Sequence, residues 1–329
     1  MKLKFAFLKL FLGCISLLLI NTKFTSIIKA EELQKVELNN EIKKGKFLIG
    51  LKQYLGGEND SFSKKKNIDF ITDKGFLNLI SSNGIKHKSK QINISWVDIP
   101  IKNPKTIERI VFGPFASYES AKKQAEKLKD KGFETTVAYP KNWEVWIPFE
   151  DNLPEFELKN KISRKIKNFQ ITPVLRNEYS VIKLEGPIYI YAQEEIKING
   201  VNFGKNFYLL KDLYGTWTLV QKIEFDDYLA GVLPYEIGPN SPLEALKAQA
   251  VIARTWGIFN SDRFNMDKYH LCISTQCQVY KPSKISNKNI QKAIDATSNL
   301  ILTYENQPIN AFYHGSNGGV SATAGESWQ

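Results

Sequence analysis

Residues 224–259, EFDDYLAGVLPYEIGPNSPLEALKAQAVIARTWGIF, contain the clearest helix start in this chain of 329 residues. Ser241 is a suitable N-cap, and Pro242 follows at the first helical position, where no backbone N–H is needed. Glu244 lies three residues after the cap and completes a capping box. The spacing therefore predicts a helix that begins at Pro242 and is preceded by a tight loop.

Glu236 lies in that predicted loop, flanked by Pro234 and Gly238. A carboxyl group among apolar and conformationally stiff neighbours tends to keep its proton near neutral pH, as a general acid must. The alternative is an ordinary loop glutamate that caps a helix or pairs with a lysine. Asp226 and Asp227 precede Glu236 by ten and nine residues. They offer a second carboxylate for hydrolysis, or simply occupy a turn at the end of a strand.

Four motifs follow one another in the second half of the chain. They are YLAGVLPYE at 228–236, LEALKAQAVIART at 243–255, CQVY at 277–280 and YHGSNGG at 313–319. This ordered set resembles the stage II sporulation protein D (SpoIID) family, which includes the amidase enhancer LytB. The resemblance implies an α+β fold with a β-rich core and a few packed helices.

The same resemblance implies a function at the cell wall. The better-known members of the family are lytic transglycosylases, which cut the MurNAc-GlcNAc bonds of peptidoglycan glycan strands that lack stem peptides. The resemblance assigns to Glu236 the role of single catalytic acid and base. The competing class is a non-catalytic cell-wall-binding protein or amidase enhancer, for which the partner is a cell-wall amidase.

Other side chains in these motifs are candidates for substrate binding. Lys247 and Arg254 lie seven residues apart and share one face of the predicted helix. The alternative is a solvated stripe with a Glu244–Lys247 pair. The CQVY motif contributes Tyr280. The glycine-rich last motif lets the backbone approach a sugar closely, and its polar candidates are His314, Ser316 and Asn317.

Cys272 and Cys277 lie outside the N-terminal segment, and His270 lies two residues before the first of them. Thiolate and imidazole ligands suit zinc, and the resemblance implies a structural zinc site with one His and two Cys in this region. The cysteine spacing is looser than in zinc fingers, and His270 lies closer to Cys272 than the family pattern has it. A Cys272–Cys277 disulfide and two free thiols are the alternatives.

Residues 1–30 have the composition of an export segment. Three lysines precede the apolar run from Leu10 to Ile20, and Ala30 precedes two glutamates. We therefore expect a signal peptide or an uncleaved N-terminal anchor, although the apolar run is short for a membrane-spanning helix. The expected location is the periplasm or cell wall, with membrane contact only through this segment.

The charge is strongly basic. Lysine and arginine number 45 against 34 aspartate and glutamate residues, for a formal net charge of +11. Such a balance favours anionic wall polymers, or is a plain solvated surface. No nucleic-acid motif is present, and export argues against nucleic acid as a partner. The hydrophobic content of 43% excludes wholesale disorder.

The rest of the chain divides into segments that differ in their pattern of apolar and charged residues. Residues 31–46 are charged without clear periodicity and are predicted to form a linker. Residues 47–104 carry short apolar runs separated by turn residues, which is typical of β-strands. Residues 175–329 return to this pattern and contain all four motifs. We expect the SpoIID-like catalytic domain there, and the end of the chain just after Trp328 suggests a C-terminal truncation.

Residues 105–150 differ from both neighbours. A strand, a Gly-Pro-Phe turn, a helix capped by Ser117 and stopped at Gly132, and a second strand follow one another. This order resembles half of a SPOR domain, a small α/β module that binds glycan strands lacking stem peptides. Trp143 and Trp146 would then stack on sugar rings, or else belong to the core. A plain β-α-β connection packed on the catalytic part is the alternative.

Overall fold

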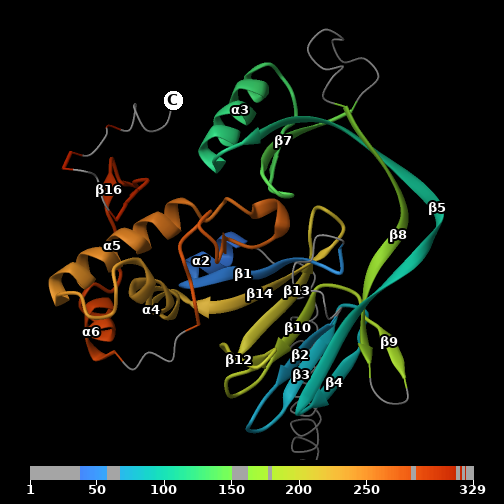
Figure 1. Cartoon of the computed structure of the whole chain (residues 1–329), viewed down its shortest axis with the longest axis horizontal. Helices are drawn as coiled ribbons and strands as arrows, with labels where there is room; N and C mark the ends of the chain where they lie inside the picture. Colours follow the sequence, from blue (N-terminus) through green and yellow to red (C-terminus); the bar gives the residue numbers. More distant parts are fainter. Residues whose placement is uncertain are drawn as a thin grey trace, which may run out of the picture.

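The computed structural model describes residues 38–57, 67–149, 162–176, 180–282, 287–315, 319, 320 and 323. Strands dominate, and a few helices gather on one side of them (Figure 1). The predicted α+β class with a β-rich core is therefore confirmed. Within the described residues, no helix is long and apolar enough to cross a membrane. The predicted export segment, residues 1–30, lies outside the described residues.

The first sheet joins strands from both ends of the chain. Its order is β15 (Leu271–Cys272), β1 (Lys46–Leu55), β14 (Trp217–Glu224), β13 (Asn206–Lys211), β10 (Ile188–Tyr191), β3 (Leu77–Ser81) and β4 (Lys86–Ser89). β1 pairs antiparallel with β14 and parallel with β15. The early β-rich segment and the segment with the motifs therefore share one sheet.

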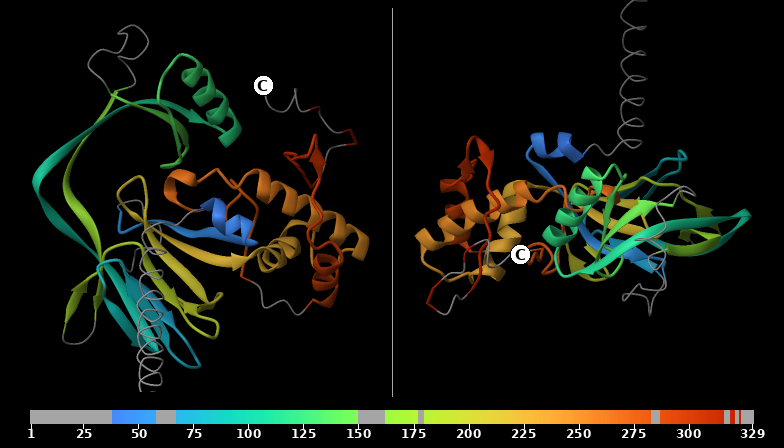
Figure 2. Two further views of the ribbon diagram at one scale, coloured as in Figure 1. Left: turned by 180° about the vertical axis from the view of Figure 1, so that it is seen from behind. Right: turned by 90° about the horizontal axis from the view of Figure 1, so that it is seen from above.

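The second sheet is built around one very long strand. Its order is β12 (Val201–Asn202), β11 (Lys197–Ile198), β2 (Asn67–Ile71), β5 (Gln91–Phe115), β7 (Trp143–Pro148) and β6 (Thr136–Ala138), and β8 (Ile162–Arg176) pairs with β5 and with β9 (Val181–Lys183). In Figures 1 and 2, β5 and β8 form a curved two-stranded ribbon that arches from the sheet to α3 (Tyr118–Asp130). The predicted boundary at residue 105 falls inside β5, so it is not a break between elements.

The helices α4 (Phe225–Glu236), α5 (Leu243–Phe259) and α6 (Lys288–Ala296) pack against one another. A short 3-10 helix, η2 (Asn265–Asp267), follows α5, and the small hairpin of β16 (Thr303–Tyr304) and β17 (Gln307–Pro308) follows α6. Leu246, Ala250 and Ala253 on α5 are buried at the spacing of one helix face. That face packs into the core of the first sheet.

Both faces of the first sheet are covered, which explains why β1 is apolar along most of its length. Phe47 and Ile49 point into the core formed with α4, α5 and α6. Leu48 points the other way, into a second core that contains Trp143 and Phe264. Successive side chains of a strand face opposite sides, so an uninterrupted apolar run is required here.

Two local predictions are wrong. The residues predicted to form a linker contain a helix, α2 (Leu38–Lys43), because the Glu41 carboxylate pairs with Lys222 of β14 at 2.9 Å and holds this turn on the sheet. The predicted capping box is absent because Pro242 itself occupies the N-cap position of α5. The Ser241 hydroxyl donates instead to the Ile237 carbonyl at 2.6 Å, and Glu244 pairs with Lys247.

The segment predicted as SPOR-like packs on the rest of the molecule as part of one core. Ser117 caps α3 as predicted, with its hydroxyl accepting from the Ser120 N–H at 3.2 Å. Trp143 is 1% exposed and donates from Nε1 to Gln276 Oε1 at 2.7 Å. Trp146 is also buried, with Arg109 stacked 3.8 Å from its ring centroid. Trp143 therefore belongs to a core, as the alternative has it, and both tryptophans are too buried to offer an open ring face to a sugar.

Candidate active site

Glu236 is the last residue of α4, so the predicted loop at this position is a helix end. Tyr228, Leu229, Val232 and Leu233 are buried on one side of α4, and this apolar stripe holds the helix on the core despite Pro234. Ile237 is the C-cap, and Gly238 follows with φ +88°, the left-handed conformation that terminates helices. The helix end thereby directs the Glu236 side chain to one fixed place.

The Glu236 carboxylate is held by donors from two distant segments. Its Oε1 accepts the Val279 N–H at 2.9 Å, and the Tyr313 hydroxyl also bonds to this carboxylate. Burial, together with the nearby charge of Glu236, raises the pKa of Tyr313, so its hydroxyl keeps its proton and acts as a donor.

A buried amide positions Tyr313 in turn. The Gln278 Nε2 donates to the Tyr313 hydroxyl at 3.1 Å, and Gln278 Oε1 accepts from the Tyr228 hydroxyl at 3.1 Å. Tyr228 is fully buried and Gln278 nearly so. Three of the resemblance motifs therefore meet in one hydrogen-bonded chain that ends on Glu236.

Glu236 lines a cavity of about 390 Å³ that is built from separate parts of the chain. One wall comes from the start of α3, a second from the segment that contains the CQVY motif, and a third from the last motif. The other lining residues are Ala116, Ser117, Tyr118, Glu119, Trp256, Arg263, Thr275, Gln276, Cys277, Gln278, Val279, Phe312 and Tyr313. A cavity with one oriented carboxyl group suits acid and base chemistry on a bound polymer.

Glu119 is a second carboxylate on the wall of this cavity, and it belongs to the SPOR-like segment. It pairs with Arg263, whose side chain is almost completely buried. Arg263 also donates to Asn260 Oδ1 and stacks on Tyr118 and Trp256, with its Cζ 4.7 and 4.9 Å from the two ring centroids. Burial lowers the pKa of Arg263, and Glu119 offsets part of that effect. The Arg263–Glu119 pair thus fixes α3 against the segment between α5 and η2, beside Glu236.

Lys247 and Arg254 do not line this cavity. The guanidinium of Arg254 is buried and donates to the carbonyls of Thr297 and Leu300, and it contacts Asp226 Oδ1 at 3.3 Å. Lys247 pairs with Glu244 at 2.8 Å, which is the alternative expected for it. The structure therefore gives Arg254 the surroundings of a structural residue.

Asp226 and Asp227 lie in the first turn of α4, at the opposite end of the helix from Glu236. Asp226 is the partner of Arg254. Partial burial, with the charges of Glu224 and Asp226, raises the pKa of Asp227. Neither aspartate lines the cavity of Glu236, so neither is placed as a second carboxylate for it.

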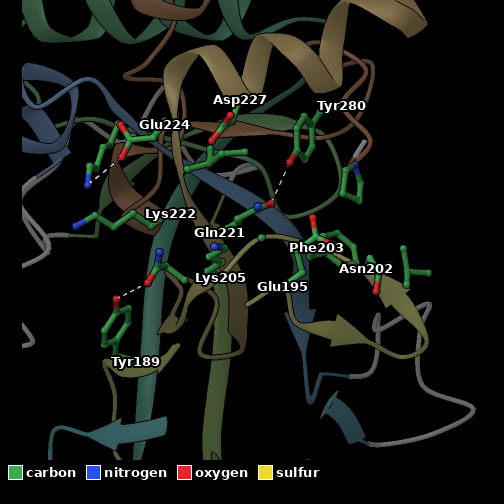
Figure 3. A pocket seen from close by; sticks show the side chains of 16 residues that line it. Tyr189, Glu195, Asn202, Phe203, Lys205, Gln221, Lys222, Glu224, Asp227 and Tyr280 are labelled. Atoms are coloured by element: carbon green, nitrogen blue, oxygen red, sulfur yellow. Dashed lines mark hydrogen bonds and ion pairs between the residues drawn. The ribbon is translucent and has the colours of Figure 1, made fainter. Parts of the chain in front are cut away.

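A larger cavity, of about 740 Å³, lies elsewhere and contains Tyr280 (Figure 3). The Tyr280 hydroxyl donates to Gln221 Oε1 at 3.1 Å, and its ring stacks on Tyr228. Asp227 also lines this cavity, and Figure 3 shows it on the same side of the picture as Tyr280. Gln278 and Val279 line the cavity of Glu236 and Tyr280 lines the larger one, so the predicted site residues Glu236 and Tyr280 do not share a cavity.

Only part of the last motif, residues 313–319, is among the described residues. His314 is exposed and is not among the residues that line the cavity of Glu236, and Ser316 and Asn317 lie outside the described residues. Tyr313, which opens this motif, and its neighbour Phe312 reach the cavity instead. Sequence reasoning did not select Tyr313, Gln278 or Val279 individually, although the motifs that contain them were the available signal.

Cys272 and Cys277 form a disulfide, with Cα atoms 5.7 Å apart. His270 is fully buried, and its Nδ1 accepts the Leu48 N–H of β1 at 2.9 Å. No group of three His, Cys, Asp or Glu side chains in the described part of the chain is placed to hold a metal ion. These residues as arranged do not fit the predicted zinc site, because both thiols and one imidazole nitrogen are already used.

Comparison with known proteins identifies the segment that carries this site. Residues 214–304 match the SpoIID family, described as stage II sporulation protein. They include Glu236, Arg254, both paired cysteines and Tyr280. This match confirms the resemblance to the SpoIID family for this part of the chain. The SPOR resemblance of residues 105–150 stays a prediction.

Individual proteins also match part of the chain. An uncharacterised protein of Brachyspira hyodysenteriae is 31% identical over 152 residues, which make up 45% of this chain and 40% of that protein. The amidase enhancer of Bacillus subtilis is 39% identical over 100 residues, 30% of this chain and 13% of the relative. Stage II sporulation protein D of the same species is 32% identical over 124 residues, 33% of this chain and 36% of the relative. The match thus spans at most 40% of the length of these three relatives.

Proposed function

We propose that this protein is a peptidoglycan lytic transglycosylase that acts on glycan strands lacking stem peptides, with Glu236 as acid and base. The observation that carries the proposal is the Glu236 carboxylate, oriented by the Val279 N–H and the Tyr313 hydroxyl on the wall of a cavity of about 390 Å³. This carboxylate lies inside the segment that matches the SpoIID family.

In this mechanism one carboxyl group transfers two protons in sequence. Protonated Glu236 donates its proton to the glycosidic oxygen as the bond between MurNAc C1 and that oxygen breaks. The resulting carboxylate accepts the proton of the MurNAc C6 hydroxyl, whose oxygen bonds to C1 and closes a 1,6-anhydro ring. Glu236 ends protonated again, and no water is consumed. Glu119 lines the same cavity, but its pairing with Arg263 leaves Glu236 as the acting carboxyl group.

This function belongs to the cell envelope. The names of the two Bacillus subtilis relatives, amidase enhancer and stage II sporulation protein D, fit a role in the cell wall. An exported protein with a formal charge of +11 is suited to that anionic environment. Peptidoglycan glycan strands are the proposed partner.

A non-catalytic enhancer role is the second candidate. It is favoured by the similarity to the amidase enhancer, which is 39% identical over the matched residues. In that role the same cavity binds glycan, and a cell-wall amidase cuts the wall. The two functions differ in whether Glu236 is needed for glycan cleavage.

Mass spectrometry of purified glycan strands, stripped of stem peptides and incubated with the protein, tests the proposal. We expect anhydromuramic ends from the wild type and a loss of about a hundredfold or more in rate with Glu236→Gln, because the proton donor is gone. Glu244→Gln is the matched control, since Glu244 is exposed, pairs with Lys247 and lies outside the cavity. It should cleave like the wild type.

The products separate the alternatives. Reducing ends in place of anhydromuramic ends would contradict the transglycosylase and indicate hydrolysis, with Glu119 as the second carboxylate to substitute next. Strand binding without any product, in wild type and Glu236→Gln alike, would favour the enhancer role. Equal cleavage by both proteins would exclude Glu236 as the acid.

A further inference from the structure

Four lysines gather where the β5–β8 ribbon meets the end of the first sheet. Lys105 of β5 and Lys167 of β8 are direct partners in the antiparallel ribbon. Lys211 is the last residue of β13, and Lys268 follows η2. Figure 1 shows the ribbon curving around the side of the molecule on which β13 lies. We call these four residues the lysine surface.

Lys167 reaches from the ribbon to the turn between β13 and β14. Its Nζ lies 2.9 Å from the position that a Cβ atom on Gly215 would take. Gly215 has φ +86° and no side chain, so the turn leaves room for the ammonium group. The ammonium charge of Lys167 on β8 therefore lies close to Lys211, which is four residues before Gly215 in the chain.

The lysines of this surface repel one another. Partial burial first, and then the positive charges of Lys167 and Lys268, lower the pKa of Lys211, while Asp212 acts in the opposite direction. Within the part of the chain that the structure describes, none of the four lysines forms an ion pair.

Two carboxylates near these lysines, among the residues that the structure describes, make hydrogen bonds inside the protein. Asp212 is buried and accepts the backbone N–H groups of Tyr214 and Thr216 at 3.1 and 2.8 Å. Asp267 is buried and accepts the Leu213 N–H at 2.9 Å and the Tyr214 hydroxyl at 3.2 Å. These two acids stabilise the turn, and among the described residues neither forms an ion pair with the four lysines.

Like charges held together without an ion-pair partner among the described residues repel one another and create a local positive potential. Lysine presents a compact charge on a flexible stem, which fits separate anions better than a rigid bidentate group would. A glycan strand stripped of stem peptides carries such anions, because each MurNAc then has a free lactyl carboxylate. A strand with its stem peptides has this carboxyl group in an amide bond.

We propose that the lysine surface binds the lactyl carboxylates of a stripped glycan strand, away from the cavity of Glu236. This inference rests on the proposed function, and it adds how the protein recognises glycan strands without stem peptides. The surface lies on the ribbon and the adjoining turn, and Lys105 and Lys167 fall outside the segment that matches the SpoIID family. Chitin oligosaccharides have the same β-1,4-linked sugar backbone without lactyl carboxylates, so they separate charge recognition from sugar recognition.

Binding is measured in the Glu236→Gln background, so that cleavage does not interfere. The probes are stripped glycan strands and chitin oligosaccharides of equal length, in titration calorimetry at low and at physiological salt. The test variant combines Lys167→Gln, Lys211→Gln and Lys268→Gln. The matched control combines Lys74→Gln, Lys86→Gln and Lys90→Gln, which removes the same charge from exposed positions around β3 and β4.

We expect the test variant to bind stripped strands about tenfold more weakly, with less dependence on salt, and the control to change by less than about twofold. Affinity for chitin oligosaccharides should not change in either variant. Equal losses in test and control variants, or an equal loss for chitin, would overturn the proposal. The proposal would also be overturned if the protein bound a phosphodiester wall polymer but no stripped strands, and if the test variant lost that polymer binding.

Failure of this inference can be told from failure of the proposed function. If Glu236→Gln abolishes cleavage but the lysine variants bind normally, only the lysine surface is excluded. If no cleavage occurs in any variant while the lysine variants lose strand binding, the surface stands and the catalytic role fails. Thermal unfolding of each variant shows whether it is folded.

Discussion

At the scale of single residues, Arg254 illustrates how burial changes the meaning of a motif position. Its place in a family motif, on one helix face with Lys247, predicts contact with substrate. Its guanidinium instead donates to the carbonyls of Thr297 and Leu300, which end α6 and begin the next segment. Burial lowers the pKa of Arg254, and Asp226 offsets part of this effect. The side chain therefore joins α4, α5 and α6.

Arg254→Met should lower the free energy of unfolding by about 2–4 kcal/mol, because two carbonyls lose their donor in a buried place. Chemical unfolding monitored by circular dichroism measures the change. Lys247→Met is the control on the same helix face, and its partly exposed pair with Glu244 contributes less than about 1 kcal/mol. Unchanged stability with weakened glycan binding would instead restore the substrate role of Arg254.

At the scale of elements, η2 is joined to the β13–β14 turn by one buried carboxylate. Asp267 accepts the Leu213 N–H and the Tyr214 hydroxyl, both from that turn. Burial raises the pKa of Asp267 to about 6, and the Leu213 N–H only partly opposes this. The folded protein therefore holds a proton on Asp267 at pH values where the unfolded chain has lost it.

This difference predicts a dependence of stability on pH with a definite sign. The folded pKa of about 6 lies above the unfolded value of 3.8, so the contribution of Asp267 to stability falls as pH rises from about 4 to about 7. The loss amounts to roughly 3 kcal/mol. Unfolding of the wild type and Asp267→Asn at pH 4.5 and 7.5 isolates it, because an asparagine side chain does not titrate in this range.

Asp73→Asn is the control for this measurement, since Asp73 is an exposed partner of Lys197 and its loss removes one negative charge. Its stability difference from the wild type should vary little between the two pH values. A stability difference for Asp267→Asn that is equal at both pH values would contradict the assignment of this titration to Asp267.

At the scale of the whole molecule, the SPOR-like segment and the motif-bearing segment share a core. Trp143, Tyr118, Phe264 and Tyr269 form one buried cluster with Leu48 and Val220 of the first sheet. The Arg263–Glu119 pair and the Trp143–Gln276 hydrogen bond connect the same parts beside Glu236. The two segments should therefore unfold together.

Arg263→Met should lower the free energy of unfolding by about 3–5 kcal/mol while keeping a single transition, because it leaves the partners of a buried ion pair unsatisfied. Differential scanning calorimetry measures both quantities. Lys122→Met is the control, since its exposed pair with Asp262 joins the same two segments and contributes at most about 1 kcal/mol. Two separate transitions in the wild type would contradict the shared core.

Much of the secondary structure follows from local pattern. Short apolar runs separated by turn residues correctly indicated strands within residues 47–104 and 175–329, and Ser117 correctly marked the start of α3. Glu236 was misassigned to a loop because Pro234 and Gly238 are local breakers. The helix continues to Glu236 because the packing of Tyr228 and Leu233 outweighs the effect of one proline.

The candidate site was predictable only in part for a related reason. The motifs identified Glu236 as the central carboxylate, but not Tyr313, Gln278 or Val279 as its neighbours. Local pattern reports which face of an element is buried, and it carries no distance between segments that lie far apart in the chain. That distance is decided by how the helices and sheets pack.

The amino-acid sequence by itself determined the strand-rich class, the family segment and the one carboxylate on which the proposed chemistry depends. Only the tertiary structure decided that the start of α3 lines the cavity of Glu236, that Arg254 is interior, that Cys272 and Cys277 pair, and that the ribbon brings Lys167 to the β13–β14 turn. The physical reason is that strand and helix signals arise from neighbours in the chain. Cavities, buried pairs and charge clusters arise from long-range packing, in which desolvation and hydrogen-bond satisfaction select the partners.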